Sequence, residues 1–326
     1  MNVRAALEAA ARRETVSPAV LEAAFGEIMD GKASPVAIAA LLVALRTKGE
    51  TVDEIVAAAR ALRARAETAP GVDPRAIDTC GTGGDGAGTF NVSTAAAFVV
   101  AGAGVPVAKH GNRAASSRAG SFDVLEALGV QADLPIAQAA GILREVGVAF
   151  FYARRAHPAM RHVAPVREEL GIRTLMNCIG PLCNPTGVRR QLVGVYAAGL
   201  VEPLAEALAA LGAEAALVVH GEDGLDEITV TAPTRAARVA DGRIEPLHLD
   251  AAALGIPRAR PADLLGGDAV ENARIVRRVL DGEDGPALDV VLVNAAAALW
   301  VAGAAGDWAQ GLALARRSVA SGAARG

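Results

Sequence analysis

The chain has 326 residues, 52% of them hydrophobic and only 3% aromatic, so its core must be built mainly from alanine, valine and leucine. Its formal net charge of -4 gives it no general attraction to nucleic acid or to anionic lipid. The longest apolar run, residues 287–302, contains Asp289 and Asn294, which argues against a membrane-spanning helix.

Residues 1–67 are predicted to form a series of helices with clear start signals. Ser17 and Ser34 each precede a proline that fits the first helical position, and residues 51–54 (TVDE) have the pattern of a capping box. The segment 68–74 is rich in proline and glycine and marks a boundary.

Beyond that boundary, short runs of β-branched residues alternate with alanine-rich helical runs. This alternation predicts an α/β domain with a mainly parallel sheet. The predicted strands are 76–79, 105–108, 148–152, 192–196, 215–219 and 228–230. The predicted helices between most of them are 93–103, 121–128, 202–211, 268–280 and 287–302.

Residues 78–94 (DTCGTGGDGAGTFNVST) follow the first predicted strand and lead into a helix. Glycines allow backbone N–H groups to approach an anion closely, and the helix N-terminus adds a positive dipole end. Ser93 and Thr94 are placed to cap that helix or to bind a phosphate. A plain strand-to-helix connection is the alternative, but the glycines, Asp85 and the NVST sequence exceed what a turn requires.

Two common phosphate motifs do not explain this loop. Gly81, Gly83 and Gly86 match G-x-G-x-x-G, but a dinucleotide fold would place an acidic residue about 20 positions further on, where this chain has Lys109. The P-loop pattern requires a G-K-[ST] sequence, which is absent here. Asp85 would repel a phosphate unless a metal ion or a substrate hydroxyl lay between them.

A second polar loop, residues 109–117 (KHGNRAASS), follows the predicted strand 105–108. Ligands of open α/β sheets lie at the carboxyl ends of the strands. Two such loops fit a substrate with phosphate at both ends, whereas a plain surface loop is the alternative. His110 and Asn112 are suited to contact an organic acceptor. The residues suited to phosphate are Lys109, Arg113, Ser116 and Ser117.

Together these motifs resemble those of the anthranilate phosphoribosyltransferase family. The likeness is carried by DTCGTGGD, NVST, KHGNRAASS and DVLEALG, and further on by HPAMRH, PVR, RT, GPL and NP. It covers roughly residues 17–303. Departures are small: Arg154 and Arg155 stand where a Pro-Asn-like pair is common, near the expected acceptor channel. The others are Arg118, Ala119, Phe122 and Cys183.

The resemblance implies a small N-terminal helical domain beside a larger α/β domain with a mainly parallel central sheet and surrounding helices. The helical domain is expected over 1–69, with roughly 160–185 packing on it, and the α/β domain over 70–326. The family joins 5-phosphoribosyl 1-diphosphate (PRPP) to the amine of anthranilate and releases diphosphate, in tryptophan biosynthesis. The reaction uses Mg²⁺, expected at two ions per subunit.

The resemblance also assigns roles to individual residues. Lys109, Asp85 and Ser93 are the expected catalytic residues, and Ser93, Asp226 and Glu227 the expected metal ligands. Asn112 and Arg167 would contact anthranilate, with His110 and His157 nearby. The residues expected to bind substrate are Gly81, Gly84, Asp85, Thr89, Asn91, Val92, Ser93, Thr94, Lys109, His110, Gly111, Asn112, Arg113, Ala114, Ala115, Ser116, Ser117, Ser121, His157 and Arg167.

The residues by themselves leave alternatives open. Asp226 and Glu227, in HGEDGLDE, would be interpreted as a solvated acidic turn, and Arg167 as one partner of a surface ion pair with a neighbouring glutamate. Cys80 beside the loop is either a nucleophile or a packed small thiol, and no base accompanies it. The three cysteines form no disulfide framework or C-x-x-C pair, so a cytoplasmic setting is expected.

Two other functions fit parts of the pattern. Pyrimidine-nucleoside phosphorylases share the expected fold, but their loop carries a lysine and a serine where this chain has residues 78–80 (DTC). A non-catalytic nucleic-acid-binding relative would need a basic face, which the net charge of -4 does not favour. We therefore expect no nucleic-acid partner and no membrane association. A homodimer through the alanine- and leucine-rich N-terminal helices is expected.

Overall fold

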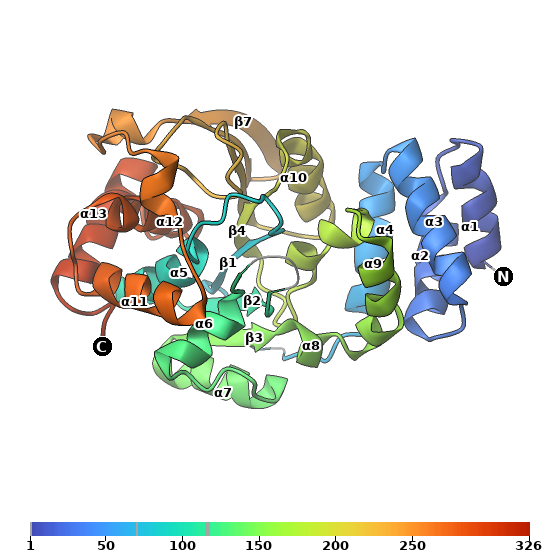
Figure 1. Cartoon of the computed structure of the whole chain (residues 1–326), viewed down its shortest axis with the longest axis horizontal. Helices are drawn as coiled ribbons and strands as arrows, with labels where there is room; N and C mark the ends of the chain where they lie inside the picture. Colours follow the sequence, from blue (N-terminus) through green and yellow to red (C-terminus); the bar gives the residue numbers. More distant parts are fainter. Residues whose placement is uncertain (1, 70, 115–117) are drawn as a thin grey trace.

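The computed structural model describes residues 2–69, 71–114 and 118–326. Its N-terminal part is a lobe of helices, shown in blue at the right of Figure 1. Two of the predicted caps are confirmed: Ser34 Oγ accepts a hydrogen bond from the Ala37 N–H at 3.3 Å, and Thr51 and Glu54 form a capping box. Ser17 stands at the N-cap of α2 before Pro18, but its side chain makes no cap hydrogen bond. The helices are α1 (Asn2–Ala11), α2 (Pro18–Met29), α3 (Pro35–Lys48) and α4 (Val52–Arg63).

The rest of the described chain is built on one sheet with the strand order β3-β2-β1-β4-β5-β6-β7. The pairs from β3 through β5 are parallel, and β6 and β7 are added antiparallel at one edge. The strands are β1 (Ile77–Gly81), β2 (Val107–Gly111), β3 (Val148–Tyr152), β4 (Arg190–Gly194), β5 (Ala215–Gly221), β6 (Thr234–Ala240) and β7 (Arg243–Leu249). The predicted fold class, an α/β domain with a mainly parallel sheet beside a helical domain, is confirmed.

One predicted strand is wrong. Residues 228–230 are apolar and buried, but they lie outside the sheet. The Ile228 N–H donates to Asn294 Oδ1 at 3.0 Å, and Asn294 Nδ2 donates to the Ile228 carbonyl at 2.7 Å. A side-chain amide thus replaces a neighbouring strand. The antiparallel strands β6 and β7 were not predicted, because their charged residues hide the apolar pattern.

Helices cover both faces of the sheet (Figure 1). Successive side chains of a strand point to opposite faces, so Leu192 packs with α5 and α12 while its neighbour Val193 packs on the side of α4 and α10. None of the helices in the described ranges is long and apolar enough to cross a membrane. These helices are α5 (Val92–Gly102), α6 (Ser121–Leu128), α7 (Ile136–Val146), α8 (Ala153–Ala156), α9 (Ala164–Leu170), α10 (Val201–Ala210), α11 (Ala269–Leu280), α12 (Pro286–Val301) and α13 (Trp308–Ala320).

A segment from the α/β part packs back on the helical lobe, where Figure 1 shows α9 beside α3. In this segment η1 contacts α2, α9 and η2 contact α3, and η3 contacts α4. Arg63 of α4 fastens the junction, because its Nε donates to the Leu182 carbonyl at 2.6 Å. The short 3₁₀ helices are η1 (Pro158–His162), η2 (Leu175–Asn177) and η3 (Gly180–Cys183).

Candidate functional site

The glycine-rich loop connects β1 to α5 at the carboxyl edge of the sheet. Its backbone requires glycine: Gly83, Gly84, Gly86 and Gly88 have φ angles of 64°, 77°, 77° and 68°, which side-chain-bearing residues rarely adopt. The loop therefore presents peptide groups rather than side chains along most of its length. That is the arrangement expected of an anion-binding loop in front of a helix N-terminus.

The segment around Asp226 lies directly against this loop. A Cβ added to Gly194, at the end of β4, would lie 1.6 Å from the Asp226 carbonyl oxygen, so that position cannot carry a side chain. The Asp226 Oδ2 accepts a hydrogen bond from the Gly83 N–H at 2.9 Å, and Glu227 Oε1 accepts one from the Ser93 N–H at 3.1 Å. Two adjacent carboxylates thus meet the loop and the first turn of α5.

The other acidic residues of the same turn are used differently. Asp223 accepts hydrogen bonds from Thr229 and Thr231 and so closes its own turn. Glu222 is exposed and lies 3.6 Å from His248. The interpretation of the whole segment as a solvated acidic turn therefore fits Glu222 but not the pair that contacts the loop.

The electrostatics of this pair suit a cation. Both residues are half-buried. Burial raises the pKa of Asp226 and the nearby charge of Asp85 raises it further, whereas for Glu227 burial and then Asp226 raise the pKa and Lys109 lowers it. The described residues hold no group of three metal-binding side chains. A site of two carboxylates, completed by waters and phosphate oxygens, is what Mg²⁺ accepts.

Lys109 is buried in the middle of β2, with 3% of its surface exposed. Its Nζ donates to the Thr79 carbonyl and, at 3.1 Å, to Ser93 Oγ. The lysine therefore ties the end of β1 to the start of α5. It also places a positive charge among the carboxylates of Asp78 and Glu227.

Asp78 and Asn184 belong to the site but are absent from the predicted site residues. Asp78 is fully buried in β1; its Oδ1 accepts from the His110 N–H at 3.1 Å and its Oδ2 from Asn184 Nδ2 at 2.8 Å. Asn184 also donates to the Ala108 carbonyl at 2.8 Å. These bonds fix the end of β2, from which Lys109 and His110 project. A charged residue inside an apolar strand was the available signal for Asp78.

His110 and His157 form a buried pair with ring centroids 5.2 Å apart. Burial and the neighbouring imidazole lower the pKa of His110 to about 3, and burial lowers that of His157 to about 4. His157 Nε2 lies 2.9 Å from the Cys183 carbonyl oxygen. His110 Nε2 and His157 Nδ1 have no hydrogen-bond partner among the described residues. Both rings are therefore neutral at pH 7, and each has one buried nitrogen without a partner among the described residues.

Arg167 lies on α9 and is half-buried. Burial lowers the pKa of its guanidinium, and within the described ranges it pairs with neither Glu168 nor Glu169. The alternative of a surface ion pair is therefore not what the structure contains. An unpaired, half-buried guanidinium is suited to a carboxylate or phosphate ligand.

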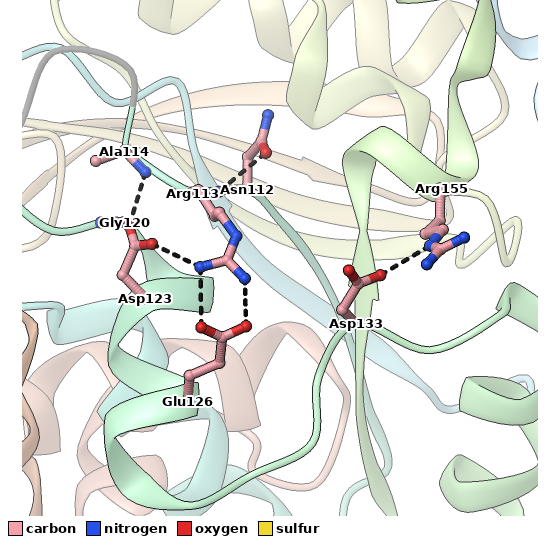
Figure 2. A network of polar contacts seen from close by, with 8 residues as sticks. All are labelled: Asn112, Arg113, Ala114, Gly120, Asp123, Glu126, Asp133 and Arg155. Carbon is pink, nitrogen blue, oxygen red and sulfur yellow. Dashed lines mark hydrogen bonds and ion pairs between the residues drawn. The ribbon is translucent and has the colours of Figure 1, made fainter.

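Arg113, predicted to hold phosphate, is already paired (Figure 2). Its Nη1 lies 3.1 Å from Asp123 Oδ1 and 2.9 Å from Glu126 Oε2, and its Nη2 donates to Glu126 Oε1. Asp123 Oδ2 also accepts from the N–H groups of Ala114 at 2.9 Å and Gly120 at 2.8 Å. These contacts close the base of the loop. A phosphate would have to displace Glu126 to reach Arg113.

Of the remaining predicted residues of this loop, some have described contacts and others lie outside the described ranges. Ser121 Oγ donates to the Asn112 carbonyl at 3.1 Å, and Gly111 is required beside it because a Cβ there would lie 2.5 Å from Ser121 Oγ. The predicted residues that lie outside the described ranges are Ala115, Ser116 and Ser117.

On the first loop, two predicted residues serve the scaffold in this structure. Thr89 forms an isolated bridge with Leu265, and Asn91 Oδ1 accepts from Asn272 Nδ2 at 3.0 Å. Val92 is buried at the start of α5, and Thr94 Oγ1 is buried without a partner in the described part of the chain. Gly81 faces Asp226, whose Oδ2 would lie 3.1 Å from an added Cβ.

The unusual arginines lie at the surface, whereas the cysteines are buried. Arg155 pairs with Asp133 at 2.7 Å, with both side chains exposed (Figure 2), and Arg154 is exposed. Burial and then Asp78 raise the pKa of the Cys80 thiol, and burial raises that of Cys183 to about 12. Cys80 is thus a packed thiol and not an activated nucleophile.

Comparison with known proteins gives a consistent result. Residues 4–66 match the helical bundle domain of the glycosyl transferase family, and residues 73–325 match its α/β domain. The anthranilate phosphoribosyltransferase of Rubrobacter xylanophilus is 57% identical over 99% of this chain and 94% of its own. That of Rhizobium meliloti is 53% identical over 97% of this chain and 93% of its own.

Solved structures agree. The anthranilate phosphoribosyltransferase of Thermus thermophilus superposes with a TM-score of 0.93 and 45% identity, covering 98% of this chain and 96% of its own. That of Saccharomyces cerevisiae, in complex with PRPP and Mg, has a TM-score of 0.91 and 27% identity over 99% and 94%. The same yeast protein in complex with 4-fluoroanthranilate has a TM-score of 0.85 and 27% identity over 95% and 90%.

Proposed function

The chain belongs to the anthranilate phosphoribosyltransferase family, and we propose that it transfers the 5-phosphoribosyl group from PRPP to the amine of anthranilate, with Mg²⁺. The products are N-(5-phosphoribosyl)anthranilate and diphosphate, and the step belongs to tryptophan biosynthesis. The observation that carries the proposal is the meeting of the Asp226 and Glu227 carboxylates with the Gly83 and Ser93 N–H groups. The proposed cation site and the proposed diphosphate site therefore lie next to each other at one end of the glycine loop.

Displacement at the anomeric carbon builds positive charge on the ribose and negative charge on the departing diphosphate. Catalysis then depends on positioning and on stabilising the leaving group. When bound, Mg²⁺ supplies positive charge to the diphosphate, and Asp226, Glu227 and Ser93 are the residues suited to hold it. The number of ions, which we propose to be two per subunit, follows the family pattern.

The chain's own groups orient the donor substrate. The glycine loop offers backbone N–H groups, and the N-terminus of α5 adds its positive dipole end. Lys109 donates to Ser93 Oγ, and the Ser93 hydroxyl is hydrogen-bonded to the Glu227 carboxylate, so both partners hold this hydroxyl at the start of α5. Asp85, which accepts from the Ala87 N–H at 3.2 Å, stays inside the loop and repels any anion that arrives without a cation.

The acceptor is proposed to bind between the sheet edge and the segment that packs on the helical lobe. Arg167 offers an unpaired guanidinium to the anthranilate carboxylate, and Asn112 lies on the loop after β2. His110 and His157 each have one ring nitrogen without a partner among the described residues, and these nitrogens are proposed to hydrogen-bond to the acceptor. With its pKa lowered to about 3, His110 is a poor proton acceptor, so we assign it hydrogen bonding and not general-base catalysis.

We further propose a domain division at residues 69 and 70, with roughly 160–185 completing the acceptor side of the helical domain. The chain is proposed to act in the cytoplasm as a homodimer through its N-terminal helices. Apolar side chains exposed on and near α3 support this: Val36 is 79% exposed and Ile172 51%. No nucleic-acid partner is proposed, given the net charge of -4.

The test is a fluorescence assay that follows the loss of anthranilate with PRPP and Mg²⁺. Turnover is expected only with both substrates and the metal present, and EDTA should abolish it reversibly. Turnover that persists in EDTA would overturn the metal-dependent reaction. Consumption of a pyrimidine nucleoside and phosphate instead of anthranilate would identify the phosphorylase alternative.

A further inference from the structure

Arg173 reaches from one part of the molecule to another. It lies between α9 and η2, on the segment that packs against the helical lobe, yet its Nη2 donates to the carbonyl of Gly84 in the glycine loop. The same guanidinium stacks on Tyr196, with Cζ 4.4 Å from the ring centroid. The Tyr196 N–H donates to Thr82 Oγ1 at 3.0 Å. Arg173 and Tyr196 therefore hold two points of one loop.

The peptide groups on either side of the Gly83–Gly84 peptide are held by two different side chains. The Gly83 N–H is bonded to Asp226 Oδ2, and the Gly84 carbonyl is bonded to Arg173. Both glycines have positive φ. Glycine tolerates this conformation, but it loses more conformational freedom than any other residue when it becomes ordered. Without the hydrogen bond from Arg173, the peptide group that carries the Gly84 carbonyl would lose this restraint on its rotation.

Tyr196 also connects this contact to the helical lobe. Its ring lines a cavity of about 90 Å³ together with Arg46, Glu50 and Thr174. Arg46 lies in the last turn of α3 and Glu50 just after that helix, whereas Tyr196 follows β4. Burial raises the pKa of the Tyr196 phenol, so the hydroxyl stays protonated. The stacked pair thus lies between the helical lobe and the glycine loop.

We propose that Arg173, stacked on Tyr196, is a positioning residue that holds the glycine loop ready for the diphosphate of PRPP and couples the loop to the helical lobe. This inference rests on the proposed function, since PRPP is the ligand whose affinity it concerns. When the loop is ordered in advance, binding does not have to order it. Arginine suits this position because its planar group stacks and donates at once, whereas lysine does not.

The expected effect is selective for one substrate. Replacing Arg173 with methionine removes a charge-assisted hydrogen bond and the stack, so the Kd for PRPP should rise about tenfold. The KM for PRPP should rise with it, while the KM for anthranilate should stay within about twofold. Arg173→Lys should resemble Arg173→Met, because the charge is kept but the planar fork is lost.

The experiment measures PRPP binding with Mg²⁺ by titration calorimetry and both KM values by fluorescence, on the full chain. Tyr196→Phe keeps the stack and should behave like the parent, whereas Tyr196→Leu should follow Arg173→Met. The double variant Arg173→Met/Tyr196→Leu should be no worse than either single variant. Arg161→Met, a change at another exposed arginine of the same segment, is the control. Low concentrations of guanidinium should partly restore Arg173→Ala.

The outcomes separate the two proposals. If the parent binds PRPP but Arg173→Met and Arg173→Lys both keep its Kd, the positioning role is wrong. It is also wrong if both KM values rise together, or if the loss of PRPP affinity follows only a fall in Tm. If the parent itself does not bind PRPP, the proposed function fails instead.

Discussion

At the scale of single residues, this site brings buried and half-buried charged groups together. Asp78 and Lys109 are buried, and the Glu227 carboxyl lies close to both Ser93 and Lys109. Buried charges destabilise a fold unless they are paired, so each must be matched by a hydrogen bond or by a ligand. Both carboxylate oxygens of Asp78 accept hydrogen bonds within the protein. Asp226 and Glu227 each accept a backbone N–H bond through one oxygen, which leaves part of their charge for a ligand.

The partly matched pair gives the first prediction. Asp226→Asn and Glu227→Gln should each lower kcat by about 100-fold or more, because the leaving diphosphate loses its cation. Added Mg²⁺ should restore part of the activity, since a weakened site refills by mass action. Glu222→Gln in the same turn is the control and should match the parent. Equal small effects of all three changes in steady-state assays would mean that the cation is held elsewhere.

Arg167 gives the second prediction. Arg167→Met should raise the KM for anthranilate by about 10- to 100-fold, because a charge-assisted bond to a carboxylate is lost. The KM for PRPP should change little. Glu168→Gln serves as the control for the ion-pair alternative and should leave both values near those of the parent. Equal rises for both substrates would count against an anthranilate-specific role.

The buried imidazoles give a prediction about pH. The pKa values of about 3 for His110 and about 4 for His157 lie below the ordinary 6.5, so the unfolded chain takes up protons that the folded chain does not. The free energy of unfolding should therefore fall as the pH drops from about 6.5 towards about 4. Each histidine contributes at most about 1.4 kcal/mol per pH unit. Calorimetry should show a shallower fall of Tm in His157→Gln, and identical slopes would contradict the assignment.

At the scale of elements, local sequence patterns predicted the strands and helix starts that depend on neighbouring residues alone. The β-branched runs placed β1 to β5 within a few residues, and the TVDE pattern at 51–54 placed the start of α4. The same reasoning failed for β6, β7 and residues 228–230. Charged residues on an edge pair obscure alternation, and a buried apolar run does not reveal which group satisfies its backbone.

The backbone partner of Ile228 supplies the element-scale prediction. Asn294→Leu would leave the Ile228 N–H and carbonyl buried without partners, so the free energy of unfolding should fall by about 2–4 kcal/mol. Denaturant unfolding measures this change. Asp289→Asn, on the same helix, should shift it by no more than about 0.5 kcal/mol. A similar shift for both variants would show that the Asn294 amide is not what supports the segment.

The site itself was predictable in part, for the same reason. Glycine-rich and cationic loops at strand ends have a local signature, and family motifs pointed to Asp226 and Glu227. Asp78, Asn184 and Arg173 were missed as site residues because their roles depend on long-range contacts: Asp78 and Asn184 are 106 positions apart in sequence. No local pattern in a single sequence reports such a pairing.

At the scale of the whole molecule, the helical lobe has more apolar surface than its own contacts bury. Helix α3 is apolar on nearly all sides, and Val36 and Val43 remain 79% and 36% exposed. A helix that is apolar all round normally lies inside a structure. This surface supports the proposed homodimer through the N-terminal helices.

The proposed dimer can be tested by placing charged residues in the exposed apolar surface of α3. Val36→Lys combined with Val43→Lys should shift the protein from dimer to monomer in sedimentation at micromolar concentration, because the interface would bury unpaired like charges. Val146→Lys, at a position 65% exposed on α7, should leave the mass unchanged. A parent protein that sediments as a monomer would overturn the proposal, as would a dimer that survives the double change.

The sheet ends at β7, whose outer side is an open edge, and its residues there resist aggregation. Pro246 stands opposite Ala237 in the middle of the pair, and Arg243, Glu245 and His248 are exposed along the strand. Proline offers no N–H, and charges on an edge discourage a second strand from pairing with it. These residues should therefore disfavour edge-to-edge pairing between two molecules during folding, when exposed strand edges are most prone to aggregate. Pro246→Val would remove that protection and should lower the yield of refolding at high concentration.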